Sequence, residues 1–460
     1  MKYPRRLIKS IRQEPELYAL IVWFSVMWSW SFFTDMLDLA GSKRQGYILA
    51  TFVVLLNVTI TTTAIWQIIK VLRYIQRTYS TKWLLALGLP LFALADFLAS
   101  WLTTIIWLGP QGQVSNVLPM GSLALPMVNT PFKFAARFVG FYGLAAFLWF
   151  FFYLVSQKKT RTLALFPLTL ATVLSLVGWF VYRPTAGQPV KVTLVSEKLT
   201  NRVPTINTKG ADLVVFPEYG LEKVDNKNLK ERIIRTKDNE PRTYFVGSEQ
   251  IYSTSYTGHI NNMKFGNTTD GITQTEHKWR LIPAGEDLPY VLRTLLRATG
   301  QKSTLDYFSY AKGVIKGDRQ LRPFVINDQV HVAAAVCSSI ISPEDYRDFA
   351  RDGATIFTNS ASLSIFQGSP LFAWQQKSLA RFMAVANARY FLQSANAASA
   401  YALNPSGNQI GEVKGRNTLD VVVYTNTTKT FYTHTGEWLV LLGGMSIVGV
   451  GFAEWRRLKN

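Results

Sequence analysis

The sequence predicts a multi-pass α-helical membrane domain joined to an α/β domain that lies outside the membrane. Residues 1–182 are rich in Leu, Phe, Trp and Ala, and they contain apolar stretches of the length that a spanning helix requires, about 20 residues. Residues 188–430 instead alternate short apolar strands with amphipathic helices. A last apolar run covers residues 436–454. We therefore expect three parts, at residues 1–186, 187–432 and 433–460.

Charge and composition exclude several classes of function. The 460 residues carry a net charge of +20, but much of the excess stands in short clusters beside apolar segments, and no arginine-rich recognition helix is present. We therefore expect no nucleic-acid partner. The single cysteine, Cys337, excludes a disulfide within the chain. The four histidines are scattered without a metal-binding spacing, so we expect no metal and no other cofactor.

Six membrane helices are expected, near residues 17–35, 47–69, 84–107, 136–156, 163–182 and 436–454. Asp96 lies in the middle of the third helix, where an ionisable group is costly. It either accepts a structural hydrogen bond from a neighbouring helix or faces a wet cavity. Residues 109–135 contain several prolines and are expected to form a long external loop.

The basic residues predict how the helices are oriented. They form four clusters, within residues 2–12, 70–82, 158–161 and 456–459. Threading the chain back and forth through six helices places all four clusters on one side of the membrane, which the positive-inside rule makes the cytoplasmic side. Only Lys43 and Arg44 fall on the other side. The α/β domain is then extracytoplasmic, and the first apolar run is a retained anchor because no cleavage site follows it.

The α/β region has a recognisable order of elements. Strands are expected at residues 191–195, 211–216, 243–246, 331–336, 355–358, 399–403 and 409–413, and helices at residues 229–237 and 370–388. The stretch 258–271 is rich in Gly and Asn and is a candidate lid.

Three strand ends carry residues capable of chemistry. Glu218 follows a buried strand and Pro217, a position that suits a general base, although most Pro-Glu pairs are plain turns. Lys278 precedes Glu286 by eight residues with Pro and Gly between them. The segment either turns back to bring cation and carboxylate together or forms a basic surface hairpin. Cys337 ends an apolar strand just before a helix start at Ser342, where nearby helix amides and a lysine would lower its pKa and make it nucleophilic. The alternative is a buried inert thiol.

Taken in this order, Glu218, Lys278 and Cys337 resemble the Glu-Lys-Cys triad of the nitrilase, or carbon–nitrogen hydrolase, superfamily. One segment resembles the apolipoprotein N-acyltransferase family more narrowly, through Lys278, Leu281, Ile282, Pro283, Gly285, Glu286 and Pro289. The resemblance spans about residues 80–455, including the flanking helices. It implies a nitrilase-like αββα sandwich on the extracytoplasmic side of a bacterial cytoplasmic membrane.

The family's chemistry then implies a role for each residue. Glu218 would be the general base, Lys278 would stabilise the oxyanion, and Cys337 would carry a fatty acyl chain as a thioester. Glu286 would support Lys278. The resemblance implies two partners: a phospholipid as acyl donor, and a lipoprotein with an N-terminal diacylglyceryl-cysteine as acceptor.

The sequence departs from the family at three motifs, and it has six expected helices where the family has more, with the shortage before residue 84. Ser338 and Ser339 stand where the family has Tyr-Glu, Asn387 stands where it has Glu, and Ala397 and Ala398 stand where it has Thr-Gly. Two other functions therefore compete with lipoprotein N-acylation. One is a membrane-anchored amidase, or an acyltransferase that acts on another amine. The other is a catalytically degenerate homologue that binds lipid or lipoprotein.

Overall fold

Six helices of the computed structural model are long and apolar enough to cross a membrane, as the sequence predicts. They are α2 (Pro15–Thr34), α4 (Lys43–Thr78), α5 (Thr81–Ile106), α7 (Ala136–Ser156), α8 (Leu165–Val181) and α15 (Trp438–Lys459). Short 3-10 turns, η1 (Pro131–Ala135) and η2 (Arg161–Ala164), precede α7 and α8. The structure describes residues 14–35, 41–115, 117–184, 187–198, 206–207, 210–222, 224–225, 233–234, 242–253, 258–307, 313–366 and 368–459.

The helix ends that carry basic clusters lie together. Glu14, at the start of α2, pairs with Arg73 near the end of α4 and accepts a hydrogen bond of 2.6 Å from Gln157, just after α7. Tyr74 bonds Glu454, which stands two residues before the cluster at the end of α15. Three of the four predicted clusters therefore flank the same end of the helical bundle. The fourth, residues 2–12, lies outside the described residues.

The proline-rich stretch 109–135 is not the free external loop that the sequence predicts. It contains the short helix α6 (Ala124–Met127), and residues 117–128 are almost entirely buried against the helices. Asp96 fixes this stretch: its Oδ2 accepts hydrogen bonds from Trp149 Nε1 at 2.8 Å and from the Leu123 amide at 3.4 Å. Of the two expectations for Asp96, the structure supports the hydrogen bond to a neighbouring helix.

The α/β part has the predicted nitrilase-like fold, with its sheet curved into a half-barrel. One sheet holds twelve strands in the order β7-β6-β5-β3-β1-β11-β10-β9-β8, with β12 and β13 beside β11 and β14 beside β1. The strands are β1 (Pro189–Glu197), β3 (Leu213–Val215), β5 (Tyr244–Ser253), β6 (Gly258–Asn267), β7 (Gly271–His277), β8 (Phe324–Asn327), β9 (Val330–Val336), β10 (Ile356–Ser362), β11 (Tyr390–Asn396), β12 (Ala400–Leu403), β13 (Gln409–Val413) and β14 (Asn417–Tyr424). A separate pair joins β2 (Ile206–Asn207) and β4 (Ile233–Ile234).

The curvature brings distant strands face to face around an apolar core. Phe265 of β6 and Phe324 of β8 stack at 4.6 Å between ring centres, although the two strands are not neighbours in the sheet. Alternating inward side chains such as Val192, Val215 and Val332 fill the same core. The central strands β1, β3, β9, β10 and β11 run parallel, so their carboxyl ends meet at one edge.

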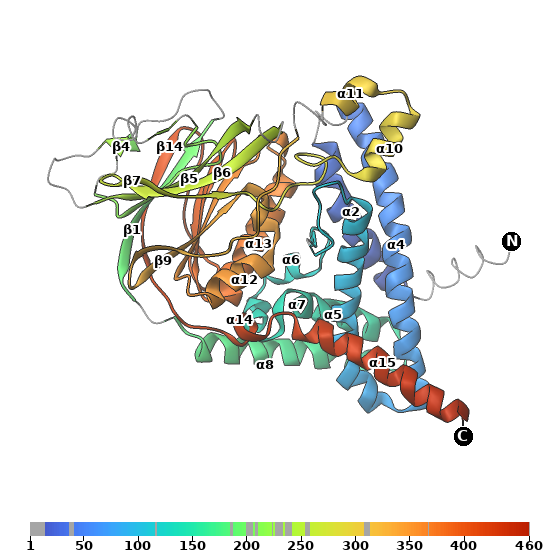
Figure 1. Cartoon of the computed structure of the whole chain (residues 1–460). Coiled ribbons are helices and arrows are strands. Elements are labelled where there is room, and N and C mark those ends of the chain that lie inside the picture. The colour runs from blue at the N-terminus through green and yellow to red at the C-terminus, as the bar shows by residue number, and fades with distance from the viewer. Residues whose placement is uncertain are drawn as a thin grey trace.

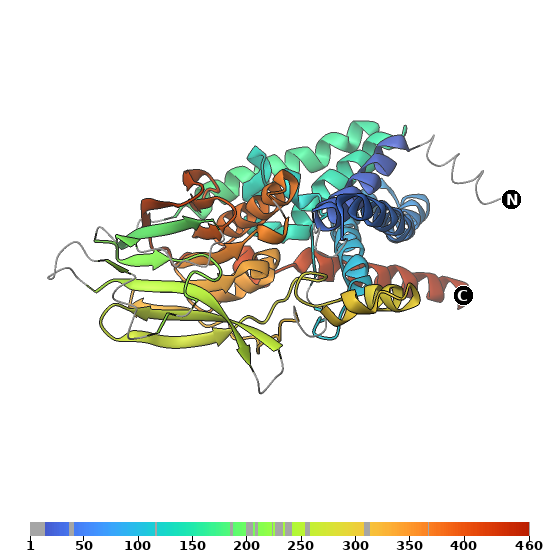
Figure 2. The same cartoon turned by 90° about the horizontal axis from the view of Figure 1, so that it is seen from above.

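Helices α12 (Pro343–Arg351) and α13 (Pro370–Ala386) cover the outer face of β9, β10 and β11 and lie between the sheet and the long helices (Figures 1 and 2). Their apolar side chains belong to one core that continues into the membrane helices, as the edge contact between Phe382 of α13 and Phe141 of α7 shows at 4.9 Å. The other helices are α10 (Tyr290–Ala298), α11 (Lys302–Asp306) and α14 (Phe431–Thr435).

Two local expectations are wrong. The helix expected at residues 229–237 lies mostly outside the described residues, and its described part, Ile233–Ile234, is strand β4. The candidate lid at residues 258–271 is instead β6 and the turn after it, and β6 pairs with β5 over its whole length. Its polar side chains are buried because Asn262 and Lys264 bond Glu249 of β5 and Asn261 faces the site described below, a placement that residue type alone does not reveal. The domain boundaries at 186 and 432 remain predictions.

Arg137 joins the helices to the sheet. Its buried guanidinium donates to four carbonyl groups: Val385 at the end of α13, Gly178 and Tyr182 at the end of α8, and Pro405 in the turn between β12 and β13, all at 2.9 to 3.0 Å. Such a planar group with several donors suits the satisfaction of carbonyls at helix ends. Because these carbonyls come from separate elements, this side chain fixes the two parts relative to each other.

A break in α7 forms a second connection. Gly140 has φ of +73°, and a Cβ at this position would lie 2.7 Å from Oε2 of Glu437. The break frees the amides of Phe141 and Tyr142, which donate to the Glu437 carboxylate at 2.8 and 3.1 Å. Glu437 therefore caps the second half of α7 from the segment that leads into α15.

Replacing Glu437 with Gln should flatten the pH dependence of stability. Burial raises the pKa of Glu437 to about 7, against the opposing effect of the two amides. Because this pKa is higher in the folded than in the unfolded protein, the group's stabilising contribution is complete below the unfolded pKa and falls by roughly 1–3 kcal/mol as the pH rises through 7. Thermal unfolding in detergent, followed by tryptophan fluorescence from about pH 5 to about pH 8, measures this slope.

The exposed Glu222→Gln variant is the control and should keep the wild-type slope. Equal slopes for Glu437→Gln and the wild type would show that Glu437 does not titrate in this range.

Candidate active site

The three residues predicted from strand ends lie together in the structure. Glu218 follows β3, Lys278 follows β7 and Cys337 follows β9. The Lys278 ammonium lies 3.3 Å from Glu218 Oε1 and 2.7 Å from Glu286 Oε1. Lys278 and Glu218 are 1% and 2% exposed, so this is a buried cation between two carboxylates. The basic surface hairpin considered for Lys278 is therefore excluded.

The backbone around Glu218 is tightly held. Its amide donates to Ala361 of β10 at 3.2 Å, and its carbonyl accepts from the side chain of Asn396 at the end of β11. Tyr219 has φ of +64°, a conformation that a bulky residue adopts only under constraint, and its amide is held by Ser248 at 3.2 Å. These contacts aim the carboxylate into the site.

Glu286 reaches Lys278 because residues 282–287 form a compact loop. The amides of Gly285 and Glu286 donate to the Ile282 carbonyl, and the Ile282 amide donates to Glu286 Oε2 at 3.0 Å. Ala284 takes φ of +64° within this loop. One carboxylate oxygen of Glu286 thus holds its own loop and the other holds Lys278.

The charges set the protonation states of the site. Burial raises the pKa of Glu218, and Glu286 raises it further against the opposing effect of Lys278. Burial alone lowers the pKa of Lys278, but the two carboxylates outweigh it, so its pKa is raised and the ammonium stays charged. A carboxylate with a raised pKa is a better match for proton transfer near neutral pH than an ordinary one.

Cys337 begins the 3-10 turn η4 (Cys337–Ile341) with φ of +45°, and its Sγ lies 3.5 Å from the Ser362 carbonyl. Burial raises the pKa of the thiol well above its usual value, and Glu218 raises it further, while Lys278 lowers it. The lowered pKa expected from helix amides and a lysine is therefore wrong, although Lys278 does act in the lowering direction. Ser342 does cap α12, through a hydrogen bond from the Asp345 amide at 3.3 Å, but burial has the larger effect on the thiol. At rest Cys337 is a thiol that requires a base.

Asn261 was not identified from the sequence. It lies on β6 and is fully buried, and its Nδ2 donates to Glu218 Oε1 at 3.3 Å and to Glu286 Oε1 at 3.2 Å. The backbone carbonyl of Asn261 accepts a hydrogen bond from the backbone amide of Lys278 at 2.8 Å. One residue thus contacts both carboxylates and the segment that carries the cation. The only signal in the sequence is its place in the polar stretch that was interpreted as a lid.

The residues that depart from the family pattern have defined contacts. The Ser338 hydroxyl donates to the Arg280 carbonyl at 2.6 Å, which ties the turn after Cys337 to the segment after Lys278. Arg280 in turn pairs with Asp345 at 3.1 Å and Glu344 at 3.2 Å on α12. Asn387 accepts a hydrogen bond from Thr433 at 3.2 Å. Both Ser338 and Asn387 are thus structural in this chain.

The site opens into a cavity of about 140 Å³. Its walls include Glu218, Glu286 and Cys337, together with Tyr219, Gln250, His259, Ile282, Gly285, Val314, Ser362, Ser364 and Ile365. Within the described part of the chain, no group of three or more His, Cys, Asp or Glu residues is arranged to hold a metal ion. The cavity exposes a nucleophile and a base, and the Lys278 ammonium contacts that base; together these are the groups that acyl transfer requires.

Comparison with known proteins agrees with this architecture. Residues 245–430 match the family model of the carbon–nitrogen hydrolases, a range that includes Lys278, Glu286 and Cys337 but not Glu218. The chain is 22% identical to an apolipoprotein N-acyltransferase of Vibrio vulnificus, over 99% of this chain and 92% of that protein.

Solved structures of nitrilase-superfamily proteins overlap with about half of the chain. They include Nit3 of Saccharomyces cerevisiae (14% identity, TM-score 0.36, covering 52% of this chain and 91% of that chain). They also include an amidase from Nesterenkonia sp. (12% identity, TM-score 0.35, covering 56% and 97%).

Alkylation of Cys337 should respond in opposite directions to two substitutions. Because Lys278 lowers the thiol pKa and Glu218 raises it, Lys278→Met should slow alkylation at neutral pH and Glu218→Gln should accelerate it, each by about tenfold per unit of pKa change. Cys337 is the sole cysteine, so intact mass after reaction with iodoacetamide reports on this thiol alone.

Lys302→Met, on the exposed surface of α11, is the control and should react like the wild type. If Glu218→Gln also slowed the reaction, Glu218 would act as the base for the thiol during alkylation, and this role would outweigh its electrostatic effect on the thiol pKa.

Proposed function

Because this chain contains a carbon–nitrogen hydrolase domain and is a divergent homologue of the apolipoprotein N-acyltransferases, we propose that it transfers a fatty acyl chain from a phospholipid, through a thioester on Cys337, to the α-amine of a diacylglyceryl-cysteine lipoprotein. The observation that carries this proposal is the buried Lys278 ammonium, held between Glu218 and Glu286 beside a lone cysteine on a strained turn.

In the first half-reaction, Cys337 Sγ attacks the ester carbonyl of the phospholipid while its proton passes to Glu218. The carbonyl electrons move to the oxygen, which the Lys278 ammonium stabilises. An ammonium has three N–H groups, and two of these point at carboxylates, so one remains for the oxyanion. Collapse breaks the ester C–O bond, and Glu218 returns the proton to the departing lysophospholipid hydroxyl.

In the second half-reaction, the α-amine attacks the thioester carbonyl and gives a proton to Glu218. The tetrahedral oxyanion again lies near Lys278, and its collapse forms the amide and releases the Cys337 sulfur, which regains the proton. Glu286 keeps Lys278 in place through its 2.7 Å contact. Asn261 is a positioning residue in this scheme, because its amide bridges the carboxylates on either side of the cation.

The same proposal places the protein in a bacterial cytoplasmic membrane with the sheet on the extracytoplasmic side. The helix ends near residues 14, 73, 157 and 454 are joined by hydrogen bonds and carry the basic clusters, so one end of the bundle suits the cytoplasmic surface. The sheet is attached at the opposite ends of α8 and α15, which keeps the site near the bilayer surface and its lipid substrates.

One observation favours a second candidate, an amidase or an acyltransferase that acts on another amine. The cavity at Cys337, about 140 Å³, is smaller than the range of roughly 300–1,000 Å³ usual for ligands of drug size. A short acyl group fits this space directly, whereas a long chain must extend out of it.

Incubation of the detergent-purified protein with phospholipid vesicles should add a fatty-acyl mass to the wild type and none to Cys337→Ser. The adduct should be released by neutral hydroxylamine, because a thioester is cleaved and an amide is not. Intact-protein mass spectrometry measures both. If the folded protein formed no adduct with vesicles of several different phospholipid headgroups, a phospholipid donor would be excluded. That result would favour the amidase or a non-catalytic lipid-binding protein.

Asn261→Ala should slow formation of this adduct by roughly ten- to a hundredfold, since each hydrogen bond to a charged group contributes about 1.5–3 kcal/mol. The loss of a donor to Glu218 should also move the acid limb of the pH–rate profile to higher pH. Asn262→Ala is the matched control, because this neighbour contacts Glu249 and His277 instead. An unchanged profile for Asn261→Ala would leave this residue with a structural role only.

A further inference from the structure

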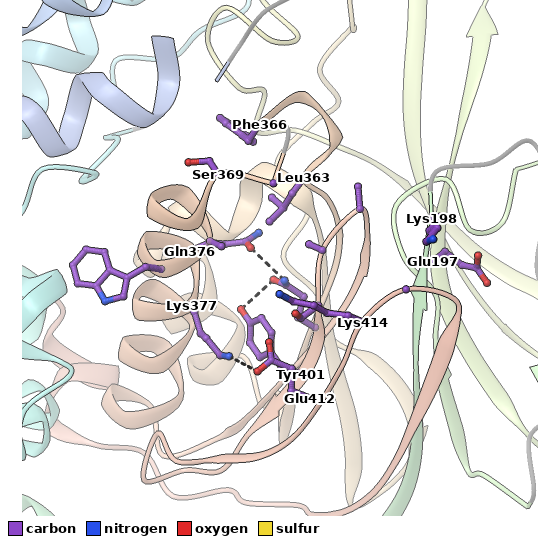
Figure 3. A pocket seen from close by; sticks show the side chains of 18 residues that line it. Glu197, Lys198, Leu363, Phe366, Ser369, Gln376, Lys377, Tyr401, Glu412 and Lys414 are labelled. Atoms are coloured by element: carbon purple, nitrogen blue, oxygen red, sulfur yellow. Dashed lines mark hydrogen bonds and ion pairs between the residues drawn. The ribbon is translucent and has the colours of Figure 1, made fainter. Parts of the chain in front are cut away.

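A second, larger cavity lies behind the proposed active site. It has a volume of about 530 Å³, within the usual size range of small-molecule sites, and none of Glu218, Lys278 and Cys337 lines it. It lies between α13, the ends of β1 and β11, and the hairpin of β12 and β13 (Figure 3).

Two segments separate this cavity from the active site. In the first, Leu363 and Phe366 line the large cavity, while Ser362, Ser364 and Ile365 line the small one. In the second, Ala397 and Ala398 line the large cavity directly after Asn396, whose side chain bonds the Glu218 carbonyl. The two cavities share no lining residue, so a ligand in the large cavity would occupy a place distinct from that of the reacting acyl group.

The interior of the cavity is apolar and its polar groups are largely satisfied. Its lining includes Leu363, Phe366, Trp374 and Tyr401, together with Ala373, Ala397 and Ala398. Gln393 bonds Gln376 at 3.3 Å and Tyr401 at 3.2 Å, and these contacts are drawn in Figure 3. The cavity floor therefore offers apolar contact rather than free hydrogen-bonding groups.

The charged groups at its opening leave an excess of positive charge. Lys377 pairs with Glu412 at 2.9 Å, and Glu197 lies 3.8 Å from Arg416. Lys198 and Lys414, by contrast, have no carboxylate partner among the residues that the structure describes. In Figure 3 the Lys414 amino group points across the cavity toward α13, and Lys198 lies on the opposite side from this helix.

The cavity also adjoins the membrane helices. Phe366 stacks on Phe372 of α13, and both rings make edge contacts of 5.9 Å with Phe32 near the end of α2. The β12–β13 hairpin contacts η1, just before α7, where the Lys133 ammonium donates to the Asn408 side chain at 3.1 Å. A ligand would thus meet apolar walls continuous with the membrane part and, at the rim, two lysines to which the described residues offer no carboxylate.

We propose that this cavity binds the phosphate-bearing headgroup region of a membrane phospholipid as a non-reacting ligand, with the phosphate at the rim that carries Lys414 and Lys198 and the glycerol and upper acyl chain against the apolar lining from α13 and residues 363–366. Charge-assisted hydrogen bonds from lysine suit a phosphate oxygen, and the apolar floor excludes a free, fully hydrated anion as the preferred occupant. This site does not depend on the proposed catalytic function.

Native mass spectrometry of the full chain in detergent, titrated with phosphatidylglycerol, tests the proposal. All samples carry Cys337→Ala, so no thioester forms and binding alone is measured. In the double variant Lys198→Gln/Lys414→Gln, we expect one bound phosphatidylglycerol fewer per protein, because the affinity of this site for the lipid falls by about tenfold or more. Ala373→Trp, which fills the cavity from α13 without altering charge, should remove the same lipid. Lys302→Gln is the control and should bind as the parent does.

Three probes separate the sources of the anion. The affinity for phosphatidylglycerol should exceed that for diacylglycerol, which lacks the phosphate, by about tenfold or more. Inorganic phosphate at millimolar concentration should not displace the lipid. The proposal would be overturned if inorganic phosphate displaced the lipid or if diacylglycerol bound equally well. It would also be overturned by unchanged lipid binding in both cavity variants, or by lysine-dependent capture of a soluble acidic peptide in place of lipid.

Discussion

The buried ammonium of Lys278 is the constraint around which the α/β part is organised. Removing an ion from water costs several kcal/mol unless close partners and further hydrogen bonds replace the lost hydration. Glu218, Glu286 and Asn261 supply them, and they come from the end of β3, a compact loop and the middle of β6. The positive φ angles of Tyr219, Ala284 and Cys337 lie in the segments that approach this cation. Backbone strain is thus concentrated where several strand ends must converge.

Convergence of this kind requires rigid support, which the structure provides through one continuous core. The apolar face of α13 packs on the sheet, and its far side packs on α2, α6 and α7. Arg137 and Glu437 then satisfy backbone groups at the breaks and ends of these helices, where an apolar side chain would leave carbonyls or amides unpaired. The sheet is therefore fixed to the helical bundle through its core rather than suspended on flexible linkers.

The length of apolar runs and the positions of strand ends were predictable from the sequence, because both are local properties. Six helices, the strands that lead to Glu218 and Cys337, and the cap at Ser342 follow from such local signals. Asn261 was not predictable, since a buried polar strand and an exposed loop share the same composition. The thiol pKa was predicted with the wrong sign because helix amides are visible in the sequence, whereas the burial that outweighs them depends on the three-dimensional packing.

The two cavities share their walls, and this sharing gives the departures from the family pattern a physical meaning. The segment 396–398 bonds the Glu218 carbonyl on one side and lines the larger cavity on the other, and small alanine side chains there leave that cavity open. Ser338 meanwhile ties the turn after Cys337 to the Lys278 segment through a single short hydrogen bond. At residues 338 and 339, small serines stand where the resemblance implies a bulky and a charged side chain, so the reacting groups are retained while the space around them changes. The departures at 338–339 and 397–398 therefore lie in segments that border the proposed site, where side-chain size affects which substrate fits.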